Sequence, residues 1–149
     1  MWMDDIMSGH ITPCVGAVIL DNQERVLLVK HVPEKGGFWA EKYICPGGRL
    51  EPGEALEEGV RREIWEETGL EINIVRWVRP MERVIRDAQG ILLDHVLYLD
   101  VIAKVKKGTF QPASDVGSGA WFTKKELQEI VNEIHEDTQE LLREAGLLT

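Results

Sequence analysis

Three glutamates, Glu63, Glu66 and Glu67, have the spacing in this chain that most directly suggests chemistry. The segment 55–68 is rich in good helix formers, and Gly69 stands where a helix C-terminal cap is expected. At positions i, i+3 and i+4 the three carboxylates share one helix face, where like charges destabilise a helix by roughly 0.2–0.5 kcal/mol per pair. A bound divalent cation such as Mg²⁺ removes that repulsion, because hard cations take oxygen ligands. Taken alone, the three glutamates leave two interpretations equally open, a metal site and a solvated acidic helix face.

The residues around these glutamates form a longer pattern with defined spacing. A glycine-rich turn at residues 45–48 leads into segment 48–70, which reads GRLEPGEALEEGVRREIWEETGL. This segment resembles the Nudix box at every fixed position, and by that resemblance the chain is identified as a member of the Nudix family. The match covers nine positions over 23 residues, which are Gly48, Glu54, Arg62, Glu63, Ile64, Glu66, Glu67, Gly69 and Leu70.

The resemblance implies a metal-dependent hydrolase that cleaves phosphoanhydride bonds. In the family the box glutamates bind Mg²⁺, with Mn²⁺ as a possible substitute, so Glu63, Glu66 and Glu67 are the expected ligands. The backbone at Gly48 is expected to coordinate as well. Cleavage by water needs neutralised phosphate charge and an activated water, and metal ions supply both.

Further residues have expected roles beside the metal. In the family, Arg62 orients a neighbouring glutamate, and the alternative is a surface salt bridge of little value. Glu54 is expected to hold the loop against the helix. The general base is either a box glutamate, here Glu63, or an acid on the loop before the last short strand. Asp115 is the single acid on that loop, and it is one methylene shorter than the glutamate of MutT-like members. The expected catalytic set is Arg62, Glu63, Glu66, Glu67 and Asp115.

The substrate is less well marked than the metal site. Phe38, Trp39 and Tyr43 are candidates for stacking on a nucleobase, and ordinary packing is the alternative. The proline and the tyrosine that mark other Nudix subfamilies are missing from their places. The leading hypothesis is a nucleoside triphosphate cut to a monophosphate and pyrophosphate. The alternatives are an ADP-ribose or nucleotide-sugar pyrophosphatase and, in another class, a non-catalytic nucleotide-sensing module. A homodimer is consistent with the family.

Composition limits the partners and the compartment. The net charge of −9 argues against a surface for duplex nucleic acid, because phosphate binding needs clustered Lys and Arg. A small anionic nucleotide remains compatible, since metal ions supply local positive charge. Cys14 and Cys45 are too few for a disulfide framework and are expected to be reduced thiols. The sequence shows no signal peptide and no apolar run of membrane length, so we expect a cytoplasmic protein without a membrane partner.

The 149 residues predict an α+β domain, and the Nudix resemblance implies an α/β/α sandwich with a mixed central sheet. Residues 1–12 are expected to form an N-terminal arm, and residues 13–149 a single Nudix domain. Pro80 is expected to interrupt its strand, because proline cannot donate to a β-ladder. Thr123 and Glu126 predict a capping box that starts one long C-terminal helix ending near Gly146. Strands are expected at 14–20, 25–32, 38–44, 71–86, 91–105 and 120–122.

Overall fold

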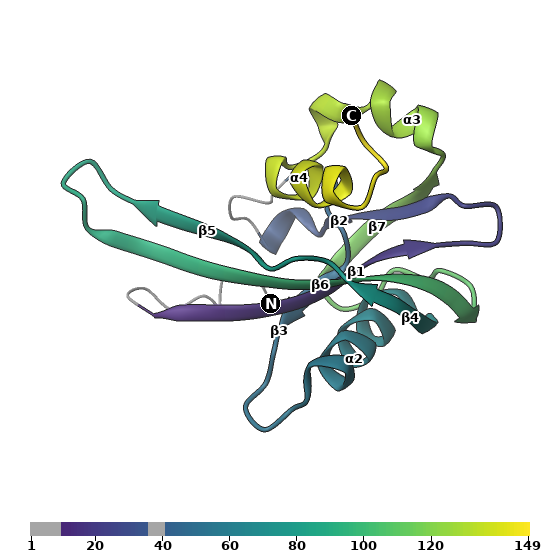
Figure 1. Cartoon of the computed structure of the whole chain (residues 1–149), viewed down its shortest axis with the longest axis horizontal. Coiled ribbons are helices and arrows are strands. Elements are labelled where there is room, and N and C mark those ends of the chain that lie inside the picture. Colours follow the sequence, from purple (N-terminus) through teal and green to yellow (C-terminus); the bar gives the residue numbers. More distant parts are fainter. Residues whose placement is uncertain (1–9, 36–40) are drawn as a thin grey trace.

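A mixed seven-stranded sheet forms the middle of the computed structural model, which describes residues 10–35 and 41–149. Strands β1 and β6 run parallel to each other, and the other strand pairs are antiparallel. The order across the sheet is β4-β6-β1-β2-β7, while β5 pairs with β6 and β3 with β1 (Figure 1). The strands are β1 (Ile11–Leu20), β2 (Val26–His31), β3 (Gly47–Arg49), β4 (Glu71–Trp77), β5 (Met81–Arg86), β6 (Leu92–Lys107) and β7 (Val116–Phe122). The mixed sheet and the α+β class confirm the prediction from the sequence.

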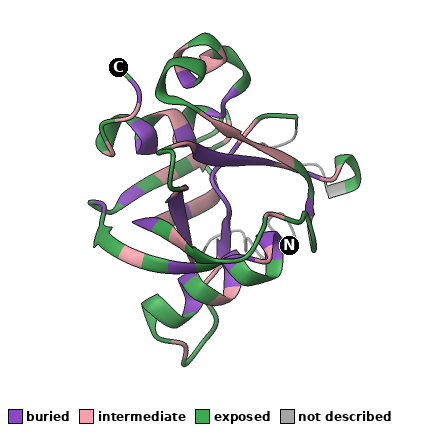
Figure 2. Cartoon of the chain, turned by 90° about the vertical axis from the view of Figure 1, so that its right-hand side faces the viewer, coloured by how far each residue is buried: buried purple, intermediate pink, exposed green. Residues whose placement is uncertain are grey.

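Helical layers cover both faces of the sheet, with α2 (Leu56–Thr68) on one face and the C-terminal helices on the other (Figure 1). Val60 and Ile64 of α2 pack into the core on the first face, whereas Leu127 and Leu142 pack into the core on the second. Strand β1 is covered on both faces, so its segment 14–19 is buried without alternation (Figure 2). Full burial of one aliphatic side chain contributes roughly 1.5–3 kcal/mol. The two cores confirm the sandwich that the Nudix resemblance implied.

The interruption expected at Pro80 is confirmed. Strand β4 ends at Trp77 and β5 begins at Met81, and both strands pair with β6 along the same edge. Between the two strands, the Val78 amide donates to the carbonyl oxygen of Asp100 at 2.9 Å. The chain therefore stays attached to β6 through the bend, and only the residues beside the proline leave the ladder.

Two strands begin three or more residues before the predicted start. Strand β1 begins at Ile11 rather than at residue 14, within the segment expected to be an N-terminal arm, and residues 1–9 lie outside the described residues. Strand β7 begins at Val116 rather than at residue 120, because its early residues pair with β2 as far as His31. Of the strand expected at 38–44, only residues 41–44 are described, and they form isolated bridges through Tyr43 and Ile44. Element ends depend on such non-local pairing and are the least predictable feature of a sequence.

The prediction of one long C-terminal helix is wrong. The segment forms α3 (Lys124–Glu129), a 3₁₀ turn η2 (Val131–Glu133) and α4 (Glu136–Glu144). The start is as predicted, since the Thr123 side chain accepts from the Glu126 amide at 3.1 Å. The break follows from tertiary pairing: the Tyr43 amide donates to Glu133 at 2.8 Å, and the His135 amide donates back to Tyr43 at 3.0 Å. These bonds use backbone groups that a continuous helix would have paired internally.

In the part of the chain that the structure describes, no helix is both long and apolar enough to cross a lipid bilayer.

The side chain of Gln139 stabilises the break before α4, which gives a test. Its amide nitrogen donates to the carbonyls of Val131 at 3.0 Å and Ile134 at 2.9 Å. We expect Gln139→Glu to lower the free energy of unfolding by roughly 1–3 kcal/mol, because a carboxylate of the same size cannot donate to them. Gln128→Glu is the matched control, because the half-buried Gln128 accepts a bond from the Thr149 hydroxyl and donates none among the described residues. Equal effects of the two substitutions in urea denaturation would contradict this account.

Candidate functional site

The site begins at a close approach of two glycines. Gly47 in β3 pairs with Gly16 in β1, and a side chain at Gly47 has no room. An added Cβ at Gly47 would lie 2.4 Å from the Val15 carbonyl oxygen and 2.7 Å from the Gly16 Cα. The amide of Gly47 donates to Oε1 of Glu67 at 2.9 Å. The glycine-rich turn thus brings a backbone donor directly against the helix that carries the glutamates.

Helix α2 turns two of its three clustered glutamates inward. The helix ends at Gly69, which adopts the left-handed conformation with φ 73°, as its sequence predicted. Glu63 and Glu67 are both 0% exposed, whereas the Glu66 side chain is 43% exposed. The reading of the whole cluster as a solvated acidic face is therefore wrong for two of its members. Like charges brought together out of water need a compensating positive charge or a proton.

Arg62 supplies positive charge to the cluster through several contacts. Its guanidinium donates to Glu63 at 2.8 Å and to Glu66 at 3.3 Å. It also donates to both carboxylate oxygens of Glu54, at 2.6 and 3.0 Å, and to the carbonyl of Arg49 at 3.0 Å. The pair with Glu54 is the main cause that raises the pKa of Arg62 above its usual range, and it lowers the pKa of Glu54. Arg62 thus contacts Glu63 and Glu54 at once, and its role in orienting Glu63 remains a prediction.

Glu67 occupies the most unusual electrostatic position. Burial, and next the charge of Glu63, raise the pKa of Glu67 well above its ordinary value. Its Oε1 accepts from Gly47, but its Oε2 is buried and has no hydrogen-bond partner among the described residues. The Nε2 atom of His31 lies 4.0 Å from that oxygen, and burial lowers the pKa of His31 to about 4. A neutral histidine and an unsatisfied carboxylate oxygen leave this position suited to a further ligand.

Asp115 lies beside the same cluster, as expected from its place before the last strand of the sheet. Its negative charge raises the pKa of both Glu67 and His31, although burial has the larger effect on each. The loop that carries it is tied to the end of α2, where the Ala113 amide donates to the Glu67 carbonyl at 3.2 Å. Its own carbonyl accepts from the Val32 amide at 2.7 Å. Glu63 and Asp115 therefore both remain candidates for the general base.

The residues present fit a hard divalent cation such as Mg²⁺. The buried Oε2 of Glu67 lacks a partner in the described structure, and the carboxylate of Glu63 shares the same buried face. Gly48 follows directly after Gly47, so its backbone lies next to the same turn. Within residues 10–35 and 41–149, no three acidic, histidine or cysteine side chains are gathered closely enough to hold an ion in this arrangement. Binding would therefore require the carboxylates of Glu63, Glu66 and Glu67 to move closer together.

Comparison with known proteins decides the family. The model of the NUDIX domain matches residues 10–144, which is most of the chain. The chain belongs to the Nudix family. The crystal structure of a MutT NUDIX hydrolase from Burkholderia pseudomallei shares the fold, with a TM-score of 0.72 and 24% identity, covering 91% of this chain and 98% of that chain.

Curated Nudix relatives resemble the chain to different extents. Over 138 residues it is 34% identical to nucleoside triphosphatase NudI of Enterobacter sp. (strain 638), covering 87% of this chain and 94% of that protein. Over 114 residues it is 32% identical to the ADP-ribose pyrophosphatase of Methanocaldococcus jannaschii, covering 75% of this chain and 62% of that protein. The chain spans between 14% and 49% of the length of the first curated relatives that it matches.

Of the three aromatic residues expected at the substrate, the described part of the chain includes Tyr43. Phe38 and Trp39 lie outside the described residues. Tyr43 stacks edge-on against Phe122, with ring centroids 5.1 Å apart, and the ammonium of Lys30 lies 4.5 Å from its ring centre. These contacts agree with the packing alternative for Tyr43, and its role in substrate binding remains a prediction.

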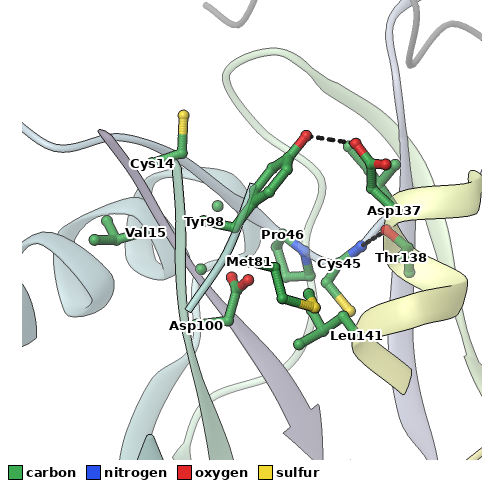
Figure 3. A pocket seen from close by; sticks show the side chains of 13 residues that line it. Cys14, Val15, Cys45, Pro46, Met81, Tyr98, Asp100, Asp137, Thr138 and Leu141 are labelled. Carbon is green, nitrogen blue, oxygen red and sulfur yellow. Dashed lines mark hydrogen bonds between the residues drawn. The ribbon is translucent and has the colours of Figure 1, made fainter. Parts of the chain in front are cut away.

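A small cavity borders the Gly47 turn, between the sheet and α4 (Figure 3). It offers about 40 Å³ of space to water molecules. Tyr98, which lines it, donates its hydroxyl to Asp137 at 2.7 Å. Asp100 points toward the same space from β6, and burial raises its pKa to about 7 (Figure 3). The cavity thus combines an aromatic ring with an acid that titrates near neutral pH.

His31 and Asp100 were not among the residues predicted for the site. Asp100 is an acid within the otherwise apolar run 96–103, whereas His31 follows the apolar run 26–29 after Lys30. A polar residue in a run that a sheet buries on both faces is a usable signal, because such a residue must lie in the interior. Applied to β6, this signal identifies Asp100, whereas His31 lies beyond the apolar run of β2 and carries no such signal.

The contacts of Arg62 predict that metal binding requires its planar guanidinium group. We expect Arg62→Lys to weaken Mg²⁺ binding roughly 10–100-fold, because lysine cannot orient Glu63 and hold Glu54 at once. The half-maximal Mg²⁺ concentration for thermal stabilisation measures this without any substrate. Arg61→Lys is the control, because the neighbouring Arg61 reaches the Ile72 carbonyl instead of the cluster. An Mg²⁺ requirement unchanged in Arg62→Lys would contradict the assignment.

The burial of Asp100 predicts a dependence of stability on pH. Its pKa rises from 3.8 to about 7 on folding, so the folded state keeps this proton longer than the unfolded state. Stability should therefore fall between pH 4 and 7, by up to roughly 4 kcal/mol from this group, and stay level above that range. Asp100→Asn cannot ionise, so its free energy of unfolding relative to the wild type should increase across this window. Asp94→Asn, on the same strand, is the control, and a difference for Asp100→Asn that stays constant with pH would refute the prediction.

Proposed function

We propose that the chain is a hydrolase that requires Mg²⁺, with Mn²⁺ as a substitute, and cleaves a phosphoanhydride bond in a nucleoside diphosphate-linked substrate. The observation that carries this proposal is Glu67, fully buried, fixed through Oε1 by the Gly47 amide, and left with an unsatisfied Oε2 beside Glu63. A bound divalent cation would give this oxygen a partner and offset the repulsion between the carboxylates. Folding alone gives no reason to bury two adjacent acids on one helix.

The residues of the site divide the chemistry among them. Glu63, Glu66, Glu67 and the backbone at Gly48 would hold the metal, which neutralises phosphate charge and activates a water when bound. Arg62 orients Glu63 through its 2.8 Å contact, and Glu54 fixes Arg62 in turn. Either Glu63 or Asp115 removes the proton from the attacking water. The two candidates differ in burial, since Glu63 is enclosed whereas Asp115 is half-buried.

A nucleoside triphosphate, cut to a monophosphate and pyrophosphate, is the preferred substrate. The similarity to a nucleoside triphosphatase that extends over 94% of that protein supports this choice. The cavity on the other side of the Gly47 turn is the proposed place for part of the nucleoside, because Gly47 belongs both to its lining and to the glutamate site. A cytoplasmic location agrees with the two cysteines, which are buried and not joined in a disulfide within the described chain.

An ADP-ribose or nucleotide-sugar pyrophosphatase is the second candidate. The relative from Methanocaldococcus jannaschii, named as an ADP-ribose pyrophosphatase, is the observation that favours it. A non-catalytic nucleotide sensor is the third candidate. The buried carboxylates of Glu63 and Glu67 argue against a sensor, because a binding module has little use for such a costly arrangement.

A phosphate-release screen with Mg²⁺ and then Mn²⁺ separates these functions. Pyrophosphatase is the coupling enzyme in one set, and alkaline phosphatase is the coupling enzyme in the other. Release from nucleoside triphosphates in the pyrophosphatase set supports the main proposal. Release confined to ADP-ribose or nucleotide sugars in the phosphatase set establishes the second candidate, and no release anywhere points to a sensor.

The same assay identifies the general base. Whichever of Glu63 and Asp115 is the base, we expect its substitution (Glu63→Gln or Asp115→Asn) to lower kcat by roughly 10²–10⁴-fold. The same substitution should remove the acidic limb of the pH–rate profile. The other substitution should retain that limb. Glu57→Gln is the control on the same helix, since Glu57 is exposed and pairs only with Arg61 among the described residues. Turnover and metal dependence unchanged in Glu63→Gln would refute the metal-site assignment.

A further inference from the structure

His31 is the last residue of β2, and its side chain enters the layer between the sheet and α2. Leu27 and Val29 of the same strand pack into the core that α2 covers, and alternation along the strand places His31 on the same face. The side chain of His31 is 2% exposed. The imidazole therefore lies beside the helix that carries the glutamates rather than in solvent.

The ring of His31 faces the carboxylate of Glu67. Its Nε2 atom lies 4.0 Å from Oε2 of Glu67, whose side chain is 0% exposed. The other oxygen of that carboxylate, Oε1, accepts from the Gly47 amide at 2.9 Å, which fixes the direction of the group. Oε2 has no hydrogen-bond partner among the described residues. Side chains from β2 and α2 thus direct a nitrogen and an oxygen atom toward the same buried space.

The separation of these two atoms suits a metal ion better than a direct contact. A hydrogen bond from a ring nitrogen to a carboxylate oxygen would bring the two atoms to about 2.7–3.2 Å. A divalent ion binds nitrogen at about 2.1 Å and oxygen at about 2.2 Å, so two ligands of one ion lie up to about 4.3 Å apart. The observed 4.0 Å is too long for the hydrogen bond and lies within the limit for two ligands of one ion.

We propose that Nε2 of His31 is a ligand of the divalent cation that Glu67 binds. The inference rests on the metal site of the proposed function, and it adds a ligand from β2 that lies outside the Nudix box. Glu63 or Glu66 would complete the site as the carboxylates approach one another. His31 and Glu67 are the pair that already stands at the separation of two ligands.

A nitrogen ligand changes which ions the site prefers. Carboxylate oxygens suit Mg²⁺, whereas imidazole suits transition-metal ions. The histidine therefore raises the affinity of the site for an ion such as Co²⁺ relative to its affinity for Mg²⁺. An outer-shell residue typically changes metal affinity by about 10–100-fold, and a direct ligand should matter no less.

The electron spin echo of bound Mn²⁺ tests this contact without any substrate. A coordinated imidazole modulates the echo through its nitrogen nucleus, and carboxylate oxygens do not. We expect nitrogen modulation for Mn²⁺ bound to the full-length wild type, and its loss in His31→Gln, which keeps the carboxylates. His135→Gln is the matched control and should retain the modulation. His135 is 6% exposed, against 8% for His31, and it caps α4 on the other face of the sheet.

Thermal stabilisation by metal ions tests the preference. His31→Gln should raise the half-maximal Co²⁺ concentration roughly tenfold or more, and should raise the half-maximal Mg²⁺ concentration by less. Equal changes for the two ions would overturn the inference, because a general loss of stability gives that result. His135→Gln should leave the ratio of the two concentrations as it is in the wild type.

The outcomes separate this inference from the proposed function. Bound Mn²⁺ without nitrogen modulation would overturn the role of His31 and leave the proposed hydrolase intact. Modulation that persists in His31→Gln, or that disappears in His135→Gln, would overturn the assignment to His31. A wild type that binds no Mn²⁺ would overturn the metal site of the proposed function and this inference with it.

Discussion

The hydrogen bond from the Gly47 amide to the buried carboxylate of Glu67 is the constraint on which the rest of the site depends. It requires β3 to lie closer to β1 than side chains allow. A Cβ at Gly47 would collide with the Val15 carbonyl, and one at Gly16 would lie 2.8 Å from the carbonyl oxygen of Pro46. Both glycines are therefore needed for space, while their backbone φ angles are within the range of other residues. This close approach fixes the distance between the turn and the inner face of α2, and so the place of every carboxylate.

The charged groups at that distance are arranged for binding rather than for stability. Taking a carboxylate out of water costs several kcal/mol, and this helix buries two of them one turn apart. Arg62 compensates Glu63 directly, but within the described residues the Glu67 carboxylate faces the Gly47 amide and a histidine that burial keeps neutral. An apolar pair in these positions would give a more stable fold. The two buried acids agree with the proposed metal site, in which carboxylate oxygens would bind a divalent cation.

How far the sequence predicted this structure depends on the range of the interactions involved. The box helix was predicted with its C-terminal cap because helix formers and Gly69 are local signals. The contacts of Arg62 and the place of Asp115 followed from the family resemblance. The break before α4 was not predicted, because the Tyr43 bridge joins residues that are about ninety positions apart in the chain. The burial of Asp100 was missed for a related reason, since it depends on β6 being an interior strand covered on both faces.

The bridge that breaks the C-terminal helix also connects the two halves of the candidate site. It holds Tyr43 to the turn before α4, and the next residues run along the cavity to the carboxylates. Within this run the Cys45 amide donates to Thr138 of α4 at 3.4 Å, the Gly47 amide binds Glu67, and the Arg49 carbonyl accepts from Arg62. Segment 43–49 is therefore bonded to α4 at one end and to α2 at the other, across the full thickness of the sandwich. A continuous C-terminal helix would have left Tyr43, at the first end of this segment, without its backbone partners. The turn that holds Glu67 would then have lost this support.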